Sequence, residues 1–329
     1  MKSLRVGLIG LGMMGRQHAR VLSMLEGVEL VGAYDPRVNS SSPAKECKHF
    51  ESLDELLKKG IDYAVVAVPT NIHFEIALKL ASKNISCLIE KPLSHDSISA
   101  WEIAEVFSSR RLVGAVGHIE RFNPAVQEAK RRLHHLGALH QVATRRLGPF
   151  PGRVSDVGVV KDLATHDIDL TMWISGQDYA KVTASVLYRS GRANEDLLAS
   201  VCTLTEGTVS NHLVNWLSPM KERKIVLTGE KGSLEIDTLT IDLTFYANGT
   251  TKNEWQDIAR FRGVSEGDIT RIALSKREPL LVEHENFRDA ILGKPAEIVS
   301  LREGSKTLEV AESMLKSALL GGEVQKLAE

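Results

Sequence analysis

Cysteine is scarce in this chain of 329 residues, which contains only Cys47, Cys87 and Cys202, far apart in the sequence. Their spacing matches no metal-binding pattern, and an odd number of cysteines does not make a disulfide framework. We therefore expect no metal site. We also expect a reducing compartment, with the cytoplasm as the default location.

An excess of charge of either sign is also absent. The 41 lysine and arginine residues are balanced by 42 aspartate and glutamate residues, which leaves a formal net charge of −1. A chain with this balance has no overall field that would draw it to nucleic acid or to an anionic membrane. We therefore expect neither of these as a partner.

Long apolar runs are missing as well. No stretch reaches the roughly 18 apolar residues that are needed to span a bilayer. The N-terminal segment places basic residues before a short apolar run, as a signal peptide does. It carries four glycines between positions 7 and 15, however, and no small-residue cleavage site follows. We therefore expect a soluble protein of about two domains.

The first third of the chain alternates short apolar runs with amphipathic helical patterns. Strands are predicted at residues 5–9, 29–34, 63–68, 86–89 and 112–116. Helices are predicted at residues 14–25, 53–59, 73–82 and 98–107. Strands separated by helices indicate βαβ units, so we expect a Rossmann-type parallel sheet with helices on both faces, in a domain of residues 1–120.

The pattern changes after Gly117, and residues 121–329 are predicted to form a second domain of the α+β class. Helices are expected at 124–135, 161–174, 282–292 and 301–319, and the last of these could pack back on the first domain. A strand is expected at 140–147, and consecutive short strands from 182 to about 258 indicate an open, mostly antiparallel sheet. Residues 260–277 are expected to be irregular and mobile. One free sheet face would need a cover, which predicts a homo-oligomer, a dimer or tetramer, formed through this sheet.

A glycine pattern follows the first predicted strand and opens the first predicted helix. Gly10, Gly12 and Gly15 form G-x-G-x-x-G, with Met13 and Met14 in its variable positions. The first glycine permits a tight turn, the second lets the backbone approach a pyrophosphate, and the third lets helix and strand pack closely. The helix N-terminus adds N–H donors for phosphate. The alternative is a plain turn, but the context favours a dinucleotide site that includes all five residues.

An acidic residue at the end of the second predicted strand strengthens this interpretation. Asp35 lies where such folds bind the adenosine ribose hydroxyls, although it could also be a turn-former before Pro36. A carboxylate there repels a 2′-phosphate, so NAD is expected in preference to NADP. Arg37 is also assigned to the cofactor site, where it could stack on adenine or, instead, accept a 2′-phosphate.

Two further strand ends are expected to face the cofactor, because ligands of open parallel sheets bind at the carboxyl ends of the strands. Pro69, Thr70, Asn71 and His73 follow the strand at 63–68. His73 could instead cap the next helix or lie in solvent, and that interpretation is preferred for it.

The stretch CLIEKPLSH ends another buried strand with two opposite charges and a proline. Glu90 and Lys91 are assigned to the cofactor crevice, since Pro92 keeps the preceding residue extended and out of a helix. A cis Lys91–Pro92 bond is possible. The alternative for Glu90 and Lys91 is a surface ion pair of little energetic value.

The motifs GLIGLGMMG, AVPTNIHFEIA, EKP and KDLATHDIDL occur in an order that resembles the Gfo/Idh/MocA oxidoreductases, named for glucose-fructose oxidoreductase and inositol dehydrogenase. The resemblance covers essentially the whole chain. It implies a dinucleotide-binding domain followed by an α/β domain with an open, mostly antiparallel sheet, as the patterns above also predict.

In KDLATHDIDL, Asp162 and His166 are four residues apart, which would place both on one face of a helix, with Asp169 further along the same stripe. Asp162 could instead be an N-cap, and a lone helical histidine is usually structural. The family resemblance implies catalytic roles for Lys91, His166 and Asp162. All three are also assigned to the substrate site.

These residue types suit the oxidation of an alcohol. His166 would be the general acid/base, since an imidazole titrates near neutral pH. Lys91 would stabilise the developing alkoxide charge, and Asp162 would orient the histidine. The enzyme class implied is an NAD(P)-dependent dehydrogenase acting on a CH–OH group.

The segment GHIERFNPAV adds two candidates for substrate binding, Arg121 and Asn123, although Arg121 could simply pair with an acid. The combination RFNPA with VVKDLATHDID most resembles the subgroup of UDP-N-acetylglucosamine 3-dehydrogenases, which implies a nucleotide-sugar substrate. Arg145, Arg146 and Arg153 could then meet a diphosphate, or they could lie on an ordinary strand edge.

Three other functions stay open. The chain could be an inositol or free-sugar dehydrogenase of the same family, a non-catalytic NAD-binding regulator, or a redox-assisted lyase or hydrolase that regenerates its own NAD.

Overall fold

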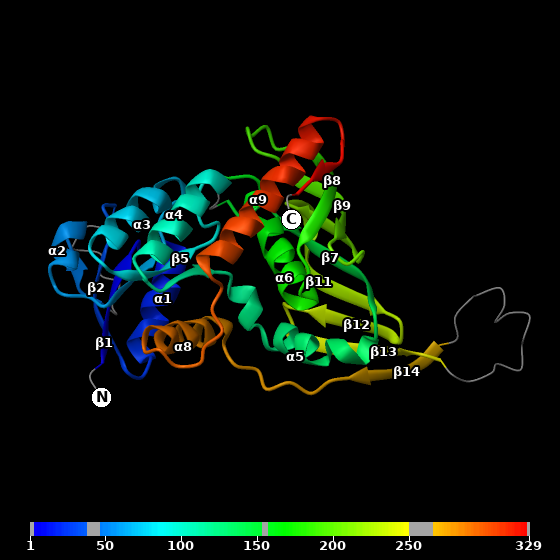
Figure 1. The fold of residues 1–329 in the computed structure, drawn as a ribbon, viewed down its shortest axis with the longest axis horizontal. Coiled ribbons are helices and arrows are strands. Elements are labelled where there is room, and N and C mark those ends of the chain that lie inside the picture. The colour runs from blue at the N-terminus through cyan, green and yellow to red at the C-terminus, as the bar shows by residue number, and fades with distance from the viewer. Residues whose placement is uncertain (1–2, 38–46, 153–156, 250–265, 328–329) are drawn as a thin grey trace, which may run out of the picture. The chain divides into compact units, whose positions relative to one another are not determined.

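The computed structural model describes residues 3–37, 47–152, 157–249 and 266–327. The chain forms two compact units, which Figure 1 shows in sequence colours. The first unit comprises residues 1–119 and 278–312, and the second comprises residues 120–277 and 313–329. Within the described residues, no helix combines the length and the apolar character needed to cross a membrane.

The first unit is built on a six-stranded sheet in which all paired neighbours are parallel. The strand order is β3-β2-β1-β4-β5-β6, so the order reverses between β1 and β4. The strands are β1 (Leu4–Ile9), β2 (Val28–Tyr34), β3 (His49–Phe50), β4 (Tyr63–Val66), β5 (Ser86–Glu90) and β6 (Gly114–Gly117). This is the predicted Rossmann-type sheet, with β3 as an additional short edge strand. Ligands of such sheets bind at the point where the order reverses.

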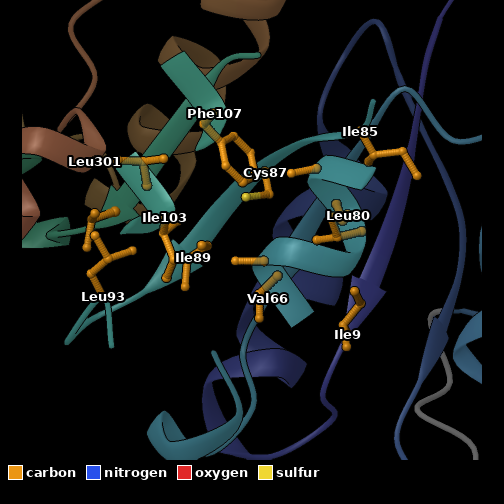
Figure 2. Close-up of a cluster of buried hydrophobic side chains, with 14 of the residues drawn as sticks. Ile9, Val66, Leu80, Ile85, Cys87, Ile89, Leu93, Ile103, Phe107 and Leu301 are labelled. Atoms are coloured by element: carbon orange, nitrogen blue, oxygen red, sulfur yellow. The ribbon is translucent and has the colours of Figure 1, made fainter. Parts of the chain in front are cut away.

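Helices cover both faces of this sheet. On one face, Leu56, Leu80 and Ile103 pack with Val66 and Ile89, in the cluster shown in Figure 2. The helices that supply this cover are α2 (Leu53–Leu57), α3 (His73–Ser82) and α4 (Ser97–Ser109). Because both faces are buried, the strands are continuous apolar runs rather than alternating ones.

The opposite face is covered by α1 (Met13–Met24) and α8 (Pro279–Ile291). Leu22 of α1 and Phe287 of α8 share a buried cluster with Leu8 of β1. Helix α8 lies far along the chain, yet it completes the core of the first unit. It therefore brings its buried polar residues to the side of the sheet that also carries α1, the helix that follows the glycine loop.

The second unit contains a nine-stranded sheet in the order β14-β13-β12-β11-β7-β10-β9-β8-β15. All its pairs are antiparallel except β7 with β10. The strands are β7 (Leu139–Pro149), β8 (Tyr179–Leu187), β9 (Leu197–Leu204), β10 (Val209–Asn215), β11 (Leu217–Gly229), β12 (Gly232–Asp237), β13 (Asp242–Asn248), β14 (Glu266–Arg271) and β15 (Gln325–Lys326). The predicted mostly antiparallel sheet and the fold class are thus confirmed.

Helices α5 (Pro124–Arg132) and α6 (Thr165–Ser175) pack on one face of this sheet. Val126 and Leu170 from these helices meet Ile225, Leu234 and Ile236 in a buried cluster. The strands alternate between buried and more exposed residues, as β12 does throughout. Large apolar side chains are exposed elsewhere on the same strands, at Val201 (60%), Val209 (41%), Tyr246 (38%) and Ile269 (69%).

Three predicted elements differ from the observed ones. Residues 266–271, expected to be irregular and mobile, form strand β14, which pairs with β13. The helix expected at 124–135 ends at Arg132 and continues as a 3-10 turn, η3 (Leu133–Leu136). The helix expected at 161–174 begins with a π-helical turn, η4 (Val160–Ala164), before α6. The pairing of β14 with β13 and the wide π-helical turn η4 both depend on tertiary contacts. Local sequence patterns do not contain this information.

The last helix, α9 (Leu301–Leu319), contributes residues to both units. Its N-terminal part belongs to the first unit, where Leu301 and Leu308 join the cluster of Figure 2. Just before it, Ser300 forms an isolated antiparallel bridge with Ala115 of β6. These contacts attach the beginning of α9 beside the edge strand of the parallel sheet.

Candidate functional site

The glycine loop between β1 and α1 has the geometry of a phosphate-binding turn. Gly10 has a φ of +99°, and a Cβ there would lie 2.2 Å from the carbonyl oxygen of Ala67. A Cβ at Gly15 would lie 2.1 Å from the carbonyl oxygen of Gly10. The first and third glycines are therefore required by the fold of the loop itself.

Gly12 is different, because no described atom lies within 4 Å of the position that its Cβ would take. It is the N-cap of α1, where no side-chain hydrogen bond caps the helix and no acidic residue occupies the first turn. The first N–H groups of α1 and the positive end of its dipole thus face a site with room for an anion. These features fit the pyrophosphate of a dinucleotide.

Asp35 lies directly behind this loop and is 4% exposed. Its Oδ2 accepts a hydrogen bond from the backbone N–H of Leu11 at 2.8 Å, and its Oδ1 accepts one from that of Arg37 at 2.9 Å. A carboxylate has about four acceptor positions, so two remain for ribose hydroxyls. The Arg37 side chain is mostly exposed, and its Nε lies 3.8 Å from Oδ1 of Asp35.

The segment after β4 forms a 3-10 turn, η1 (Thr70–Ile72), with Pro69 as its N-cap. Thr70 is buried and Asn71 is exposed. Pro69, Thr70 and Asn71 follow β4 on the carboxyl side of the sheet, which is the side of the glycine loop, and they stay candidates for cofactor contact.

His73 does not have the predicted geometry of a cofactor ligand. It is buried in α3, and its Nδ1 and Nε2 each lie 3.0 Å from a backbone carbonyl oxygen, those of Pro92 and Val68. Burial lowers the pKa of His73, so the ring is neutral and donates to one of these carbonyls. We correct the expectations for His73. It does not lie in solvent, and it is not the cap of the next helix, since the N-cap of α3 is Ile72. Its ring joins the loops after β4 and β5 instead of offering a nitrogen to the cofactor.

The end of β5 carries Glu90 and Lys91, and the Lys91–Pro92 peptide bond is cis. Glu90 Oε1 lies 2.8 Å from Nε2 of His18 in α1, and Glu90 Oε2 accepts the backbone N–H of Lys91 at 3.2 Å. Burial alone would raise the pKa of Glu90, but the hydrogen bond from His18 and nearby positive charge outweigh it and lower the pKa.

Glu90 is therefore an ionised, internally bonded carboxylate rather than the direct cofactor ligand predicted from the sequence. Neither is it half of a surface ion pair. The Lys91 side chain is only partly buried at the strand end, where it stays a candidate for contact with the reacting groups.

In the second unit, Asp162 lies within the π-helical turn η4 and His166 lies in the first turn of α6. Both are buried, with exposures of 4% and 9%. The predicted regular α-helical spacing is wrong here, because a π turn is wider than an α turn. The alternative of an N-cap is also wrong for Asp162, since Val159 is the N-cap of this turn. Such π turns often occur at functional sites.

Glu195 holds the start of this turn, a role that no pattern in the sequence predicts. Its Oε1 accepts the backbone N–H of Val160 at 2.9 Å, and its backbone carbonyl accepts that of Val159 at 3.1 Å. Burial raises the pKa of Glu195. A Cβ at Gly158 would lie 2.1 Å from the Glu195 carboxylate, so the approach of this side chain requires a glycine.

The two residues after β6 that were predicted to bind substrate form hydrogen bonds with other residues of the second unit. Arg121 forms a buried two-point ion pair with Asp169, with Nε to Oδ2 at 2.8 Å and Nη2 to Oδ1 at 2.6 Å. Asn123 caps α5 by accepting from Ala125 N–H, and it donates to the carbonyl of Thr238. We correct the prediction accordingly: pairing with an acid, the alternative for Arg121, is confirmed, and Asn123 is a helix cap.

The basic residues near the Gly/Pro-rich loop are also paired. Buried Arg146 donates to Asp167 at 2.8 Å and to Glu120 at 2.9 Å, so it is not available for a diphosphate. Arg145 is exposed, and its Nη2 lies 3.2 Å from Glu222. Arg153 lies outside the described residues.

These observations define a class of protein, and comparison with known families agrees with it. The family described as "Oxidoreductase family, NAD-binding Rossmann fold" matches residues 4–118, and the GFO/IDH/MocA C-terminal domain matches residues 126–235. The chain belongs to the GFO/IDH/MocA oxidoreductase family. The prediction of an NAD(P)-dependent dehydrogenase acting on a CH–OH group is confirmed at this level.

Particular relatives narrow the comparison. The UDP-N-acetylglucosamine 3-dehydrogenase of Acidithiobacillus ferrooxidans is 30% identical to this chain over 291 residues, 88% of each protein. A solved structure of the UDP-N-acetylglucosamine 3-dehydrogenase GnnA from that organism has a TM-score of 0.83 at 28% identity, and the match covers 96% of this chain and 98% of the other. Inositol 2-dehydrogenase 4 of Saccharopolyspora erythraea is 34% identical over 195 residues, which cover 55% of this chain and 57% of that protein.

Proposed function

We propose that this protein transfers a hydride between NAD and a ring carbinol of a nucleotide sugar, with the 3-hydroxyl of UDP-N-acetylglucosamine as the favoured substrate. The observation that carries this choice is the extent of similarity. The match to a UDP-N-acetylglucosamine 3-dehydrogenase covers 88% of both chains, whereas the match to an inositol 2-dehydrogenase at comparable identity covers 55% of this one. A cytoplasmic location is part of the proposal, because the reaction needs a pool of nicotinamide dinucleotide.

NAD is proposed as the cofactor in preference to NADP. The support is the carboxylate of Asp35 behind the glycine loop, which has acceptor capacity for ribose hydroxyls and repels a 2′-phosphate. The exposed guanidinium of Arg37 is the group that would favour NADP. The measured ratio of the two dissociation constants decides between these effects.

Three residues are proposed to act on the substrate. The nicotinamide ring supplies the hydride acceptor when NAD is bound. His166 takes the hydroxyl proton, Lys91 provides an ammonium that stabilises negative charge on the oxygen, and Asp162 orients the imidazole and favours its protonated form. This assignment is supported by the position of Lys91 at the carboxyl end of β5 and by the π-helical turn that carries Asp162 directly before α6, the helix of His166.

The test is a spectrophotometric assay of the purified protein with NAD or NADP and a panel of UDP-N-acetylglucosamine, myo-inositol, scyllo-inositol and free glucose. We expect reduced nicotinamide to form fastest with NAD and UDP-N-acetylglucosamine. A preference for an inositol would replace the nucleotide-sugar assignment by the second candidate. That candidate is favoured by a 24% identical scyllo-inositol 2-dehydrogenase of Bacillus subtilis, with a match that covers 98% of this chain.

Two outcomes of the same assay would point to the remaining alternatives. Firm NAD binding without turnover of any compound would indicate a non-catalytic regulator. Formation of product without net reduced cofactor would indicate a redox-assisted lyase or hydrolase.

We also propose that the protein is a dimer or tetramer that associates through the sheet of the second unit. The support is the exposure of large apolar side chains on this sheet, including Val201 and the cross-strand neighbours Tyr246 and Ile269. Light scattering should give a mass that is a multiple of the 36.2 kDa chain. Ile269→Glu should lower that mass, whereas a monomeric wild-type protein would contradict the proposal.

A further inference from the structure

A buried row of three polar side chains lies within the first unit, and the proposed chemistry does not use it. His18 of α1 is the middle member: its Nε2 lies 2.8 Å from Oε1 of Glu90, and its Nδ1 lies 2.8 Å from Nε2 of His284 in α8. Neither imidazole is accessible to solvent. We call His18, Glu90 and His284 the buried histidine cluster.

The protonation of each group decides which nitrogen donates in the two hydrogen bonds of the cluster. An ionised Glu90 only accepts, so Nε2 of His18 carries the proton that faces it. Burial and the neighbouring His18 lower the pKa of His284 well below its ordinary value, so this ring is neutral. Nδ1 of His284 has no hydrogen-bond partner among the described residues. Placing the His284 proton on Nε2 leaves no N–H group buried without an acceptor, and both donors then point along the row toward Glu90.

The row does not lead a proton to the surface. It ends at Nδ1 of His284, and the preceding residue, Glu283, also has both carboxyl oxygens buried without a hydrogen-bond partner in the described part of the chain. Burial and, second, the charge of Glu90 raise the pKa of Glu283 well above its ordinary value. Of these two carboxyl groups, Glu90 is therefore charged and Glu283 is protonated.

Other groups also restrict Glu90. The positive charge of Lys91 at the strand end also acts on Glu90 and helps to lower its pKa. On the β6 side, Gly117 is its cross-strand partner, and a Cβ there would lie 3.2 Å from the Glu90 carboxyl carbon. The Glu90 side chain is thus enclosed by packing on one side and by hydrogen bonds on the other. The second carboxylate oxygen of Glu90, Oε2, accepts the hydrogen bond from the backbone N–H of Lys91.

We propose that His18 and His284 are positioning residues. They fix the Glu90 carboxylate, which accepts the backbone N–H of Lys91 and so sets the position of the Lys91 side chain at the end of β5. The inference rests on the proposed function, since it gives Lys91 a role in the reaction. A displaced reacting group costs about 100-fold in rate without a comparable loss of binding. The cluster therefore acts on turnover through Lys91 and not on the affinity for NAD.

The first test compares two replacements of His18. A glutamine amide can reproduce the donor at Nε2, whereas leucine fills similar space without a donor. We expect His18→Gln to keep kcat within about threefold and His18→Leu to lower kcat about 10- to 100-fold, with the dissociation constant of NAD within about twofold in both. His284→Leu should follow His18→Leu. His134→Leu, at an exposed histidine in the second unit, is the control and should match the wild type.

The Lys91→Ala variant separates the failure of this inference from the failure of the proposed function. If Lys91→Ala turns over like the wild type, the proposed role of Lys91 is wrong. If Lys91→Ala is inactive while folded His18→Leu and His284→Leu keep wild-type kcat, the positioning role is wrong. Equal losses in His18→Gln and His18→Leu would also overturn it, because the donor would then not matter.

A second measurement needs no substrate. Nitrogen-15 spectra of labelled histidine should show His284 as the neutral Nε2–H tautomer throughout roughly pH 6 to 8. Glu90→Gln should change the signals of His18 and leave those of His134 unchanged. A His284 ring that gains a second proton in this range, or a His18 signal insensitive to Glu90→Gln, would show that the cluster does not hold Glu90.

Discussion

Glu195 accepts a hydrogen bond from the backbone N–H of Val160 at 2.9 Å. A carboxylate from the segment between β8 and β9 therefore fixes the first residue of the turn that carries Asp162. The contact joins residues 35 positions apart in the sequence. It gives a structural reason for the position of a proposed catalytic group.

Replacement of Glu195 by alanine should leave the Val160 N–H buried without an acceptor. The expected loss is about 1–3 kcal/mol in the free energy of unfolding, measured by urea denaturation, together with a lower kcat. Glu195→Gln keeps an acceptor oxygen and should retain most of the stability and turnover. Equal stability of the alanine and glutamine variants would show that the hydrogen bond does not hold the turn.

The glycine loop offers a matched pair of substitutions. Gly10→Ala should destabilise the protein by more than about 1 kcal/mol, because φ is +99° and the new Cβ would meet the carbonyl of Ala67. Gly12→Ala should fold with near wild-type stability, since its Cβ would meet no described atom. The same Cβ would occupy the approach to the helix N-terminus, so NAD affinity should fall about tenfold or more.

Urea denaturation and calorimetric titration with NAD check both variants. If Gly12→Ala binds NAD as the wild type does, the pyrophosphate does not approach α1 at this glycine. If Gly10→Ala is fully stable, the loop tolerates a different backbone conformation.

The parallel sheet of the first unit and the helices between its strands could be predicted well from the sequence, because their signals are local, whereas the packing of α8 on this sheet was not predicted. Strands buried on both faces are continuous apolar runs, and helix α3 (His73–Ser82) begins and ends where its apolar periodicity does. The glycine spacing likewise predicted the loop before α1. Only β3 was missed in this sheet, since a two-residue strand has no periodicity to detect.

The partners of polar residues could not be predicted in the same way. Arg121 was assigned to the substrate, but its partner Asp169 lies 48 residues away, on α6. His18 meets Glu90 across 72 positions and His284 across 266. A sequence shows which side chains can form an ion pair or a hydrogen bond, whereas the choice of partner depends on which strands and helices pack together.

Asp35 has an observed structural role and a proposed role in cofactor binding, and a substitution should test both. Asp35→Ala removes the acceptor of the Leu11 N–H, so we expect a small loss of stability. It also removes the negative charge that disfavours a 2′-phosphate. The dissociation constant of NAD should rise about tenfold or more, since hydrogen bonds to a charged group are worth about 1.5–3 kcal/mol, while that of NADP should change less or fall.

Titration with both dinucleotides measures this change in preference. Asp54→Asn is a suitable control, because Asp54 is an exposed carboxylate on α2 whose partner is Lys79. An unchanged ratio of the NAD and NADP dissociation constants in Asp35→Ala would remove Asp35 from the cofactor site.

Glu283 should make stability depend on pH in an unusual direction for a carboxyl group. Its pKa in the folded protein is raised well above the ordinary value of 4.5, so above pH 4.5 the folded state binds a proton that the unfolded state has lost. Stability then falls as pH rises, by up to about 1.4 kcal/mol per pH unit until the pH passes the folded pKa. Below 4.5 both states are protonated and this loss is absent.

Glu283→Gln removes the titrating group while keeping a similar shape. The stability of this variant minus that of the wild type, from urea denaturation at a series of pH values, should therefore grow with pH above 4.5. The exposed Glu297→Gln serves as the matched control, and its curve should run parallel to that of the wild type. A parallel curve for Glu283→Gln as well would mean that Glu283 is ionised in the folded state. Glu90 and Glu283 would then both be charged, so that Glu90 would no longer be the one ionised carboxylate of this pair.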